Sequence, residues 1–251
     1  MRIALVIPFG KNSTKLSDEK YFHTYIKQPE VEVIFTGKII PGETASDVVG
    51  GMEGFIEGIV TAERNGFDAV VTGPHPDVGI EEARELVKIP VLGPLQAALH
   101  MGCILGRKIC VITPSEPLRR WIQYRVRAYG LEFMVTTRSI GMSVEQMLPY
   151  YEEYLRSGNH GAPLDRLVST CVEAIKQDDA TVLTHGCGGM LWLAEPAGKR
   201  LKEIGFDIPF INPFPAAVEL AKSLVRLGIS HGRVGYPSYQ WGTADGKPKH
   251  M

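Results

Sequence analysis

The sequence predicts an α/β protein with two similar, pseudo-symmetric lobes, each a mostly parallel sheet flanked by helices. Three observations support this fold class. Short runs rich in Val and Ile alternate with amphipathic helical stretches along the chain, a pattern typical of parallel strands that are buried on both faces. Two stretches of the chain repeat the same order of motifs. The length of 251 residues is enough for two lobes, each with its own core.

The predicted strands are short apolar runs, and most of them end at Gly or Pro. They are Ile3–Ile7, Val31–Phe35, Ala69–Thr72, Pro90–Leu92, Ile109–Thr113, Glu132–Thr136, Thr181–Thr184 and Pro209–Ile211. The amphipathic stretches between them are Ala45–Arg64, Ile80–Val87, Leu95–Leu105, Leu118–Tyr129, Leu164–Lys176 and Ala216–Leu227. In such folds ligands bind beyond the carboxyl ends of the strands, so the loops after the strands should hold the chemistry.

The repeat consists of two similar stretches, one that begins at Asp68 and one that begins at Ala180. Each has a strand, a loop, a helix, an Ile-Pro strand, a turn with Pro and a helix that opens on Ala-Ala. This order favours a duplicated pair of lobes with Pro74 and Cys187 facing one cleft, although any two βαβ units share some likeness. We expect residues 1–112 with 213–251 to form lobe one and residues 113–212 to form lobe two.

Composition argues against several classes of function. Lys and Arg number 27 against 28 Asp and Glu, and a nucleic-acid partner would call for a basic surface. No apolar run approaches the ~20 residues that span a bilayer, and the run at Ile3–Ile7 is too short for a signal peptide. Four cysteines without paired short spacings do not form a disulfide framework. We expect a cytoplasmic protein that binds a small molecule, with neither nucleic acid nor membrane as partner.

Cys187 carries the strongest single signal for function. It directly follows a strand, in the stretch Thr-His-Gly-Cys-Gly-Gly-Met at 184–190. Glycines let the backbone turn sharply and bring several N–H groups toward one point, which favours a thiolate or a substrate oxyanion. The alternative is a small buried residue at a tight turn, but a core cysteine needs no neighbouring glycines. Cys103, Cys110 and Cys171 lie within apolar helices or a strand and are interpreted as core residues.

The equivalent loop of the first half carries further candidates. His75 is either a general base or a loop histidine held between two prolines. Asp77 is either a second candidate base or the cap of the helix that follows. Thr113 and Ser115 end another strand and could offer hydroxyls to a carboxylate, although Ser115 also fits a helix start. Standard nucleotide-binding and metal-protease motifs are absent from the sequence.

On these residues the chain resembles the aspartate/glutamate/hydantoin racemase superfamily over nearly its full length. The Gly-Cys-Gly-Gly-Met element at 186–190 is the most specific match, and the Asp-Ala-Val-Val run at 68–71, Ala-Arg-Glu-Leu at 83–86 and Ile-Pro-Val-Leu-Gly at 89–93 support it. The resemblance implies two α/β lobes with the active site in the cleft between them, no cofactor, and a homo-oligomer. It also implies two cysteines, one from each lobe, that exchange protons on opposite faces of the substrate α-carbon.

The sequence departs from this family pattern at the first cysteine. Counting without gaps from Asp68, or from the Ala-Arg-Glu-Leu run at 83–86, places Pro74 at the position of that cysteine. The proline side chain has no proton to transfer. His75, one residue further on, is the expected replacement, with Asp77 as the alternative. Apolar residues also flank Pro8, where hydantoin racemases usually carry Asn, and this favours a substrate with an apolar or aromatic group.

We therefore expect a cofactor-independent racemase or isomerase that transfers a proton at the α-carbon of a small carboxylate, amino acid or hydantoin-like cyclic amide. Cys187 and His75 are its expected acid/base residues. The residues expected to contact the substrate are Pro8, Gly73, Pro74, Thr113, Ser115, His185, Gly186, Gly188 and Gly189.

Three other functions stay open at this stage. The first is a lyase that resembles arylmalonate decarboxylase, in which a single thiol, here Cys187, protonates an enediolate. The second is a metallohydrolase with a four-ligand site made of His75, Asp77, His185 and Cys187. The third is a small-molecule binding protein without catalysis.

Overall fold

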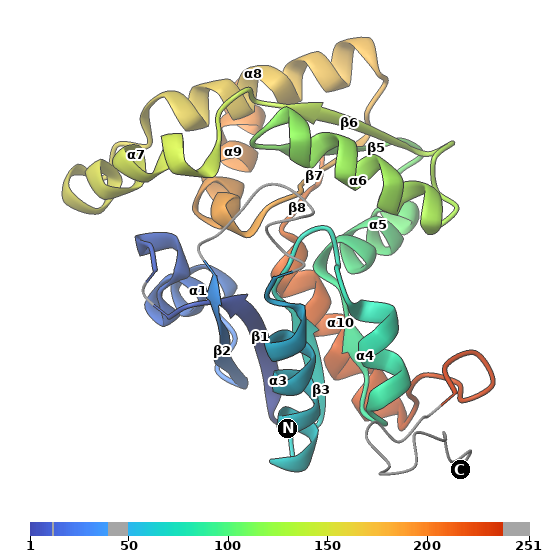
Figure 1. Cartoon of the computed structure of the whole chain (residues 1–251). Coiled ribbons are helices and arrows are strands. Elements are labelled where there is room, and N and C mark those ends of the chain that lie inside the picture. Colours follow the sequence, from blue (N-terminus) through green and yellow to red (C-terminus); the bar gives the residue numbers. More distant parts are fainter. Residues whose placement is uncertain (12, 40–49, 238–251) are drawn as a thin grey trace.

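Strands and helices alternate along the chain (Figure 1). The computed structural model describes residues 1–11, 13–39 and 50–237. The strands are β1 (Ile3–Phe9), β2 (Val31–Ile39), β3 (Ala69–Thr72), β4 (Val91–Leu92), β5 (Ile109–Thr113), β6 (Val135–Ser139), β7 (Val182–His185) and β8 (Phe210–Ile211). The α-helices are α1 (Glu19–Ile26), α3 (Met52–Arg64), α4 (Ile80–Leu86), α5 (Pro94–Leu105), α6 (Glu116–Ala128), α7 (Val144–Ser157), α8 (Gly161–Gln177), α9 (Leu191–Glu203) and α10 (Pro213–Leu227). The 3-10 turns are η1 (Lys15–Ser17) and η2 (Gly188–Met190).

Two parallel sheets organise these elements. In the described residues the first sheet has the strand order β2-β1-β3-β4, and the second has the order β6-β5-β7-β8. The strands are paired in parallel throughout both sheets. Corresponding strands of the two halves therefore take the same place, which confirms the predicted α/β fold with two similar lobes. Figure 1 shows the first lobe below and the second lobe above.

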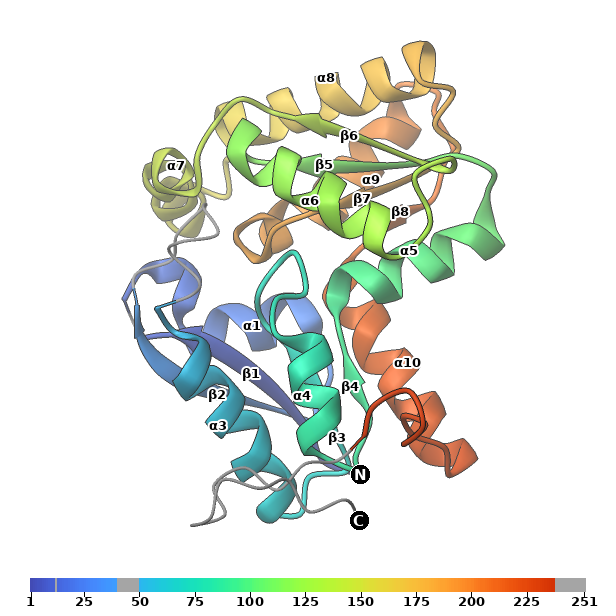
Figure 2. The ribbon, with the colours of Figure 1, turned by 45° about the vertical axis from the view of Figure 1, so that its right-hand side comes forward.

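Strand β1 is buried on both faces, as its continuous apolar run predicts. Its side chains at even positions, such as Ala4 and Val6, pack against α3 and α4 in one apolar cluster. Those at odd positions, such as Ile3 and Leu5, pack against α1 and α10 in another. The two faces follow from the period of two in a strand. Figure 2 shows α3 and α4 in front of this sheet, with α10 at its far edge.

One apolar core runs through the junction of the lobes. The cluster on the α1 face continues into the second lobe, where it includes Leu183 of β7, Trp192 of α9 and Leu167 of α8. On the other face of the second sheet, Leu99 of α5 and Ile122 of α6 close a separate cluster. Because the lobes share buried side chains, their relative position is fixed by packing as well as by the connecting chain.

Two expected boundaries are corrected by the structure. The strand expected at Glu132–Thr136 is β6, which begins at Val135, because the Leu131 and Met134 N–H groups are used in the turn after α6. The lobe boundary expected between residues 112 and 113 cuts β5, which lies in the second sheet. We therefore propose that the boundary lies before β5. The first residues of the helix expected at Ala45–Arg64 lie outside the described residues, and its described part is α3.

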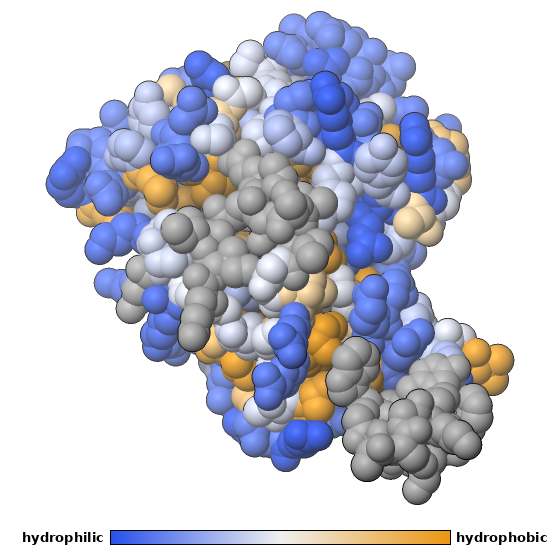
Figure 3. Space-filling model, viewed as in Figure 1, coloured by the Kyte–Doolittle hydropathy of each residue, from blue (hydrophilic) through white to orange (hydrophobic). Residues whose placement is uncertain are grey.

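Apolar side chains are concentrated inside this framework. In the view of Figure 3, hydrophilic residues cover most of the second lobe, and hydrophobic residues gather below α7 and beside α3. Among the helices of the described residues, none combines the length and the apolar content needed to cross a membrane.

Candidate active site

The loops after β3 and β7 meet at the junction of the lobes. His75 follows β3, His185 is the last residue of β7, and their ring centroids lie 6.3 Å apart. Phe214, near the start of α10, lies beside both loops: its ring centroid is 5.3 Å from that of His75, and a β-carbon on Gly188 would lie 3.3 Å from its Cζ. We call His75, His185, Cys187 and Phe214 the junction site.

Both histidines of the junction site are buried and neutral. His75 is 8% exposed and His185 is 0% exposed, and neither ring nitrogen of His75 has a hydrogen-bond partner among the described residues. Burial lowers the pKa of His75 well below its usual 6.5, and nearby His185 lowers it further. Burial also lowers the pKa of His185 to about 4, and hydrogen bonding to the Cys187 backbone and the Asn212 side chain opposes this shift. Buried polar groups without a partner are rare, and they often mark a ligand site.

Cys187 stands between β7 and η2, where the chain leaves the sheet. The Met190 N–H donates to the Cys187 carbonyl at 3.0 Å and closes the turn. A β-carbon on Gly189 would lie 3.7 Å from the Cys187 Sγ atom, so the thiol lies against the glycine turn. Its side chain is partly exposed. The expected glycine-lined thiol is therefore present at the junction site.

The other cysteines lie away from this turn. Cys110 of β5 and Cys171 of α8 are fully buried, and burial raises the pKa of both thiols. Cys103 lies on α5 and packs at the edge of the second lobe's core. The interpretation of these three thiols as core residues is confirmed for Cys110 and Cys171.

Asp77 does not take the place expected for an alternative base. Its carboxylate accepts hydrogen bonds from the backbone N–H groups of Leu95 and Gln96 at 3.0 and 2.7 Å and from the Tyr129 hydroxyl at 2.8 Å. It therefore caps α5, whereas the sequence suggested the helix that directly follows. A left-handed backbone at Asp77, with φ of 54°, makes this turn, and Asp tolerates that conformation better than most residues.

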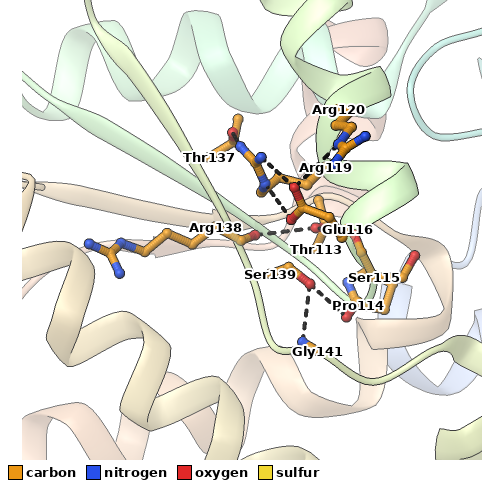
Figure 4. Close-up of polar contacts among 10 residues, drawn as sticks. All are labelled: Thr113, Pro114, Ser115, Glu116, Arg119, Arg120, Thr137, Arg138, Ser139 and Gly141. Atoms are coloured by element: carbon orange, nitrogen blue, oxygen red, sulfur yellow. Dashed lines mark hydrogen bonds and ion pairs between the residues drawn. The ribbon is translucent and has the colours of Figure 1, made fainter.

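Thr113 and Ser115 differ in what their hydroxyls do. The Thr113 hydroxyl lies 3.0 Å from the Ser115 carbonyl and 3.2 Å from the Arg138 carbonyl, so its proton is donated within the fold (Figure 4). The Ser115 hydroxyl is buried without a partner in the described part of the chain. Ser115 begins α6, as expected, but its side chain forms no capping bond. Its hydroxyl therefore stays a candidate for substrate contact.

The remaining expected contact residues shape the backbone. The Gly73 N–H donates to the Val6 carbonyl at 2.8 Å, and a β-carbon there would lie only 2.4 Å from Ile7 Cδ1. Pro74 is buried beside it, and Pro8 lies at the end of β1 against Gly37. These positions lie at the carboxyl ends of β1 and β3, which is where ligands bind in this class of fold.

Gly186 in the second lobe corresponds to Gly73, because its backbone also passes close to a neighbouring strand. Its N–H donates to the Ile112 carbonyl at 2.8 Å. A β-carbon on Gly186 would lie about 3 Å from Ile122, Thr113 and Val111. Glycine therefore lets the chain pass close to β5 before it reaches Cys187.

The four-ligand metal site expected as one alternative is not assembled. In the described residues no group of three or more His, Cys, Asp and Glu side chains lies close enough to hold an ion. Asp77 is engaged at the start of α5. The metallohydrolase interpretation is therefore wrong in its ligand set.

Three aromatic residues near the thiol were missed by the sequence analysis. The Tyr21 hydroxyl of α1 donates to the Gly188 carbonyl at 2.8 Å, and the Trp192 Nε1–H donates to the Gly189 carbonyl at 3.1 Å. Phe214 is the third. Trp192 follows the cysteine closely in sequence, but Tyr21 and Phe214 come from distant segments that carry no motif of their own.

A polar groove of about 640 Å³ lies elsewhere, along the edge strand β6. Its charged walls are paired with one another: Arg119 Nε lies 2.7 Å from Glu116 Oε2, and Arg138 Nε lies 2.6 Å from Asp178 Oδ2. Figure 4 shows the first of these pairs. Strand β5 separates β6 from β7, so this groove lies on another strand than the one that leads to Cys187.

Comparison with known proteins places this two-lobed parallel α/β fold in a class of racemases. A family model described as Asp/Glu/Hydantoin racemase matches residues 27–221, so the chain belongs to that family. Hydantoin racemase of Paenarthrobacter aurescens is 28% identical to this chain, over 96% of this chain and 97% of that protein. Hydantoin racemase of Rhizobium meliloti is 29% identical, over 79% of this chain and 80% of that protein.

Solved structures show the same arrangement of lobes. Allantoin racemase from Pseudomonas fluorescens is similar with a TM-score of 0.79 and 25% identity, over 97% of this chain and 99% of that one. Unliganded arylmalonate decarboxylase has the same fold with a TM-score of 0.56 and 18% identity, over 94% of this chain and 96% of that one.

Proposed function

We propose that this protein is a cofactor-independent racemase or isomerase of a small cyclic amide, with Cys187 and His75 as its acid/base pair. One observation carries the proposal: the fold brings buried His75, whose ring nitrogens have no partner among the described residues, to 6.3 Å from His185, which leads into the turn of Cys187. Membership of the racemase family supports it. Inversion of an α-carbon needs one group that removes a proton and another that returns a proton on the opposite face.

His75 is suited to replace the thiol that Pro74 lacks. It comes from the first lobe, whereas Cys187 comes from the second, so the two groups approach from different lobes. Because its low pKa keeps the imidazole neutral near pH 7, His75 can accept a proton from the substrate while the Cys187 thiol donates one. The reverse reaction begins with the Cys187 thiolate and the protonated imidazole.

The charge of the junction site favours a neutral cyclic amide over a free amino acid. Among the described residues, the buried basic side chains are Arg84 and Lys222. Arg84 is bound to the Val91 carbonyl and Gln96, and Lys222 forms ion pairs with Glu30 and Glu219. Arg125 lies beside the loop of His75, but its Nε and Nη2 groups donate to the Pro76 and Asp77 carbonyls at 2.9 and 2.8 Å. A substrate carboxylate would therefore meet neutral imidazoles and backbone N–H groups, and its burial without a cation is costly.

The test uses a single enantiomer of a 5-substituted hydantoin in deuterated water. Chiral chromatography follows inversion, and NMR follows exchange of the α-proton. We expect Cys187→Ala to lose inversion, and with it the exchange of the enantiomer whose α-proton faces Cys187. We expect His75→Asn to lose inversion by about 100-fold or more, the usual contribution of one acid/base group. His75→Asn should keep deuterium exchange in the enantiomer that faces Cys187. Full activity of Cys187→Ala would overturn the proposal, and full inversion by His75→Asn would remove His75 from it.

A second candidate is a decarboxylase that uses Cys187 alone. The observation that favours it is Pro74, which leaves one thiol at the junction site. In this reaction a malonate loses carbon dioxide, and Cys187 protonates the resulting enediolate on one face. Release of carbon dioxide from an arylmalonate, with a single enantiomer of the product and no effect of His75→Asn, would select this candidate over the racemase.

We also propose that the protein acts in the cytoplasm as a homo-oligomer. The composition and the family membership support this. Light scattering of the purified protein measures its mass, and a single 27.6 kDa species would contradict the oligomer.

A further inference from the structure

The Cys187 turn is held by two aromatic donors that come from different lobes. Trp192 lies on α9, directly after the turn, and binds the Gly189 carbonyl from within the second lobe. Tyr21 lies on α1 in the first lobe, 167 positions away from Gly188, and binds its carbonyl at 2.8 Å. The Tyr21 hydrogen bond thus crosses the junction of the lobes next to the thiol.

Tyr21 is fixed in place by its surroundings. Its side chain is 2% exposed. Its ring packs edge-on against Phe22, Tyr25 and Tyr151, with centroids 5.4, 5.0 and 5.4 Å away. Burial, together with Tyr151 and Cys187 nearby, raises the pKa of Tyr21 well above its usual value. The hydroxyl therefore stays protonated at any working pH and remains a hydrogen-bond donor.

The bond controls the orientation of the peptide that follows Gly188. In a planar trans peptide the carbonyl and the next N–H point in opposite directions. Because Tyr21 and the Leu191 N–H both bind the Gly188 carbonyl, the Gly189 N–H is turned to the other side of the chain. The thiol and the Gly189 N–H belong to one short turn, so a change in this peptide also moves Cys187.

The same helix supports the imidazole side of the junction site. Phe22 of α1 packs against Phe214, with centroids 6.2 Å apart, and Phe214 packs against His75. Helix α1 therefore contacts the thiol turn through Tyr21 and the wall beside His75 through Phe22. Because α1 contacts both sides of the junction site, its position can set the distance between the Cys187 thiol and the His75 imidazole.

We propose that Tyr21 is a positioning residue, which holds the Gly188 carbonyl across the lobe junction and so fixes Cys187 for proton transfer. This inference rests on the proposed role of Cys187 as an acid/base group. The hydrogen bond that the Tyr21 hydroxyl donates goes to the Gly188 carbonyl, so the proposed effect passes through the turn at Cys187, Gly188 and Gly189.

The test compares Tyr21→Phe with Tyr25→Phe. Both remove one hydroxyl from the same helix and the same aromatic cluster, but Tyr25 interacts with Tyr151 and Tyr154 and not with the turn. The first readout is the rate of Cys187 alkylation by iodoacetamide against pH, in a Cys103→Ser background that removes the other partly exposed thiol. The second is kcat and KM for a 5-substituted hydantoin.

We expect Tyr21→Phe to move the midpoint of the alkylation profile to higher pH. It should also lower kcat about tenfold, the order of one hydrogen bond, with KM unchanged within about twofold. Tyr25→Phe should leave both readouts at the wild-type values. The melting temperatures of the two variants should be similar, since both keep the ring. If Tyr21→Phe does not fold, Tyr21→Met fills the space with a flexible apolar side chain and gives the same comparison.

An alkylation profile of Tyr21→Phe identical to that of the wild type would overturn the positioning role. Equal losses in Tyr21→Phe and Tyr25→Phe would overturn it too, because they would indicate a general effect of the cluster. Alkylation needs no substrate, so a wild-type protein that does not turn over hydantoins fails the proposed function while this readout still decides the role of Tyr21.

Discussion

The substitution Asp77→Asn tests whether the carboxylate at position 77 serves the fold or the reaction. Asp77 presents two oxygens to three donors: Oδ1 accepts from Leu95 N–H at 3.0 Å, and Oδ2 accepts from Gln96 N–H at 2.7 Å and from the Tyr129 hydroxyl at 2.8 Å. Asparagine is almost the same size but has one oxygen and one NH2 group. Whichever way the amide turns, at least one buried N–H of α5 loses its acceptor and faces another donor.

The structure sets the size of the effect. A buried donor left without its acceptor costs about 1–3 kcal/mol. The neutral amide avoids part of the burial cost that raises the pKa of Asp77, so we expect a net loss of about 2 kcal/mol. For a chain of this length that corresponds to a fall of about 4–8 °C in Tm. Tyr129→Phe removes only a donor and leaves both α5 N–H groups satisfied, so it should cost about 1 kcal/mol.

Urea unfolding of the wild type and of both variants, at pH 7, measures these differences. The order of stability should be wild type, then Tyr129→Phe, then Asp77→Asn. An unchanged unfolding midpoint for Asp77→Asn refutes the capping argument. If proton exchange is also lost at an unchanged midpoint, Asp77 returns as a candidate acid/base residue in place of His75.

Three further predictions follow from burial and backbone geometry. Gly73→Ala should lower the free energy of unfolding in urea by about 2–3 kcal/mol, because its β-carbon would lie 2.4 Å from Ile7 Cδ1 and 2.8 Å from the Val6 carbonyl. Its control is Gly198→Ala in a helix, where the β-carbon would lie 3.6 Å from Cβ of Phe210. This substitution should raise the free energy of unfolding by up to about 1 kcal/mol. The free energy of unfolding should fall as the pH drops from 6.5 toward 4. In this range His185 binds a proton in the unfolded chain, whereas in the folded protein, where its pKa is about 4, it stays neutral. In denaturant titrations, His185→Asn should reduce the slope of the free energy against pH by up to about 1.4 kcal/mol per pH unit. Mass spectrometry after alkylation of the native protein should find Cys110 unmodified, since its thiol is buried and its pKa is raised.

The fold class was predictable because strands buried on both faces leave a clear mark in the sequence. The apolar runs at Ala69–Thr72 and Ile109–Thr113 became β3 and β5 with the expected bounds. The run at Glu132–Thr136 was shifted because its first residues form the turn after α6 and leave Phe133 exposed. Apolar content alone does not distinguish a turn packed beneath a helix from the strand that follows it.

Helices outside the repeat were harder to predict. Helix α7 begins with a capping box in which Ser143 and Gln146 bind one another's backbone N–H groups, and this Ser-x-x-Gln signal was available in the sequence. Helix α1 offers less, because its role depends on the contact of Tyr21 with Gly188. A contact between residues 167 positions apart follows from the docking of the lobes and leaves no local pattern.

His75 and Asp77 show how the chemistry of burial distinguishes two candidate bases that the sequence pattern left open. Two candidate bases stand two residues apart in one loop, and both are buried. A carboxylate can be buried only where donors surround it, so Asp77 turns to the N-terminus of α5, and its oxygens are occupied. Burial of a neutral imidazole costs less free energy than burial of a carboxylate. His75 therefore lies beside Phe214 and His185 with both ring nitrogens free of hydrogen bonds to the described residues. Burial itself therefore distinguishes the two residues: Asp77 must satisfy its charge and stabilises the loop, whereas neutral His75 keeps free ring nitrogens, which is why we propose His75 and not Asp77 as the acid/base residue.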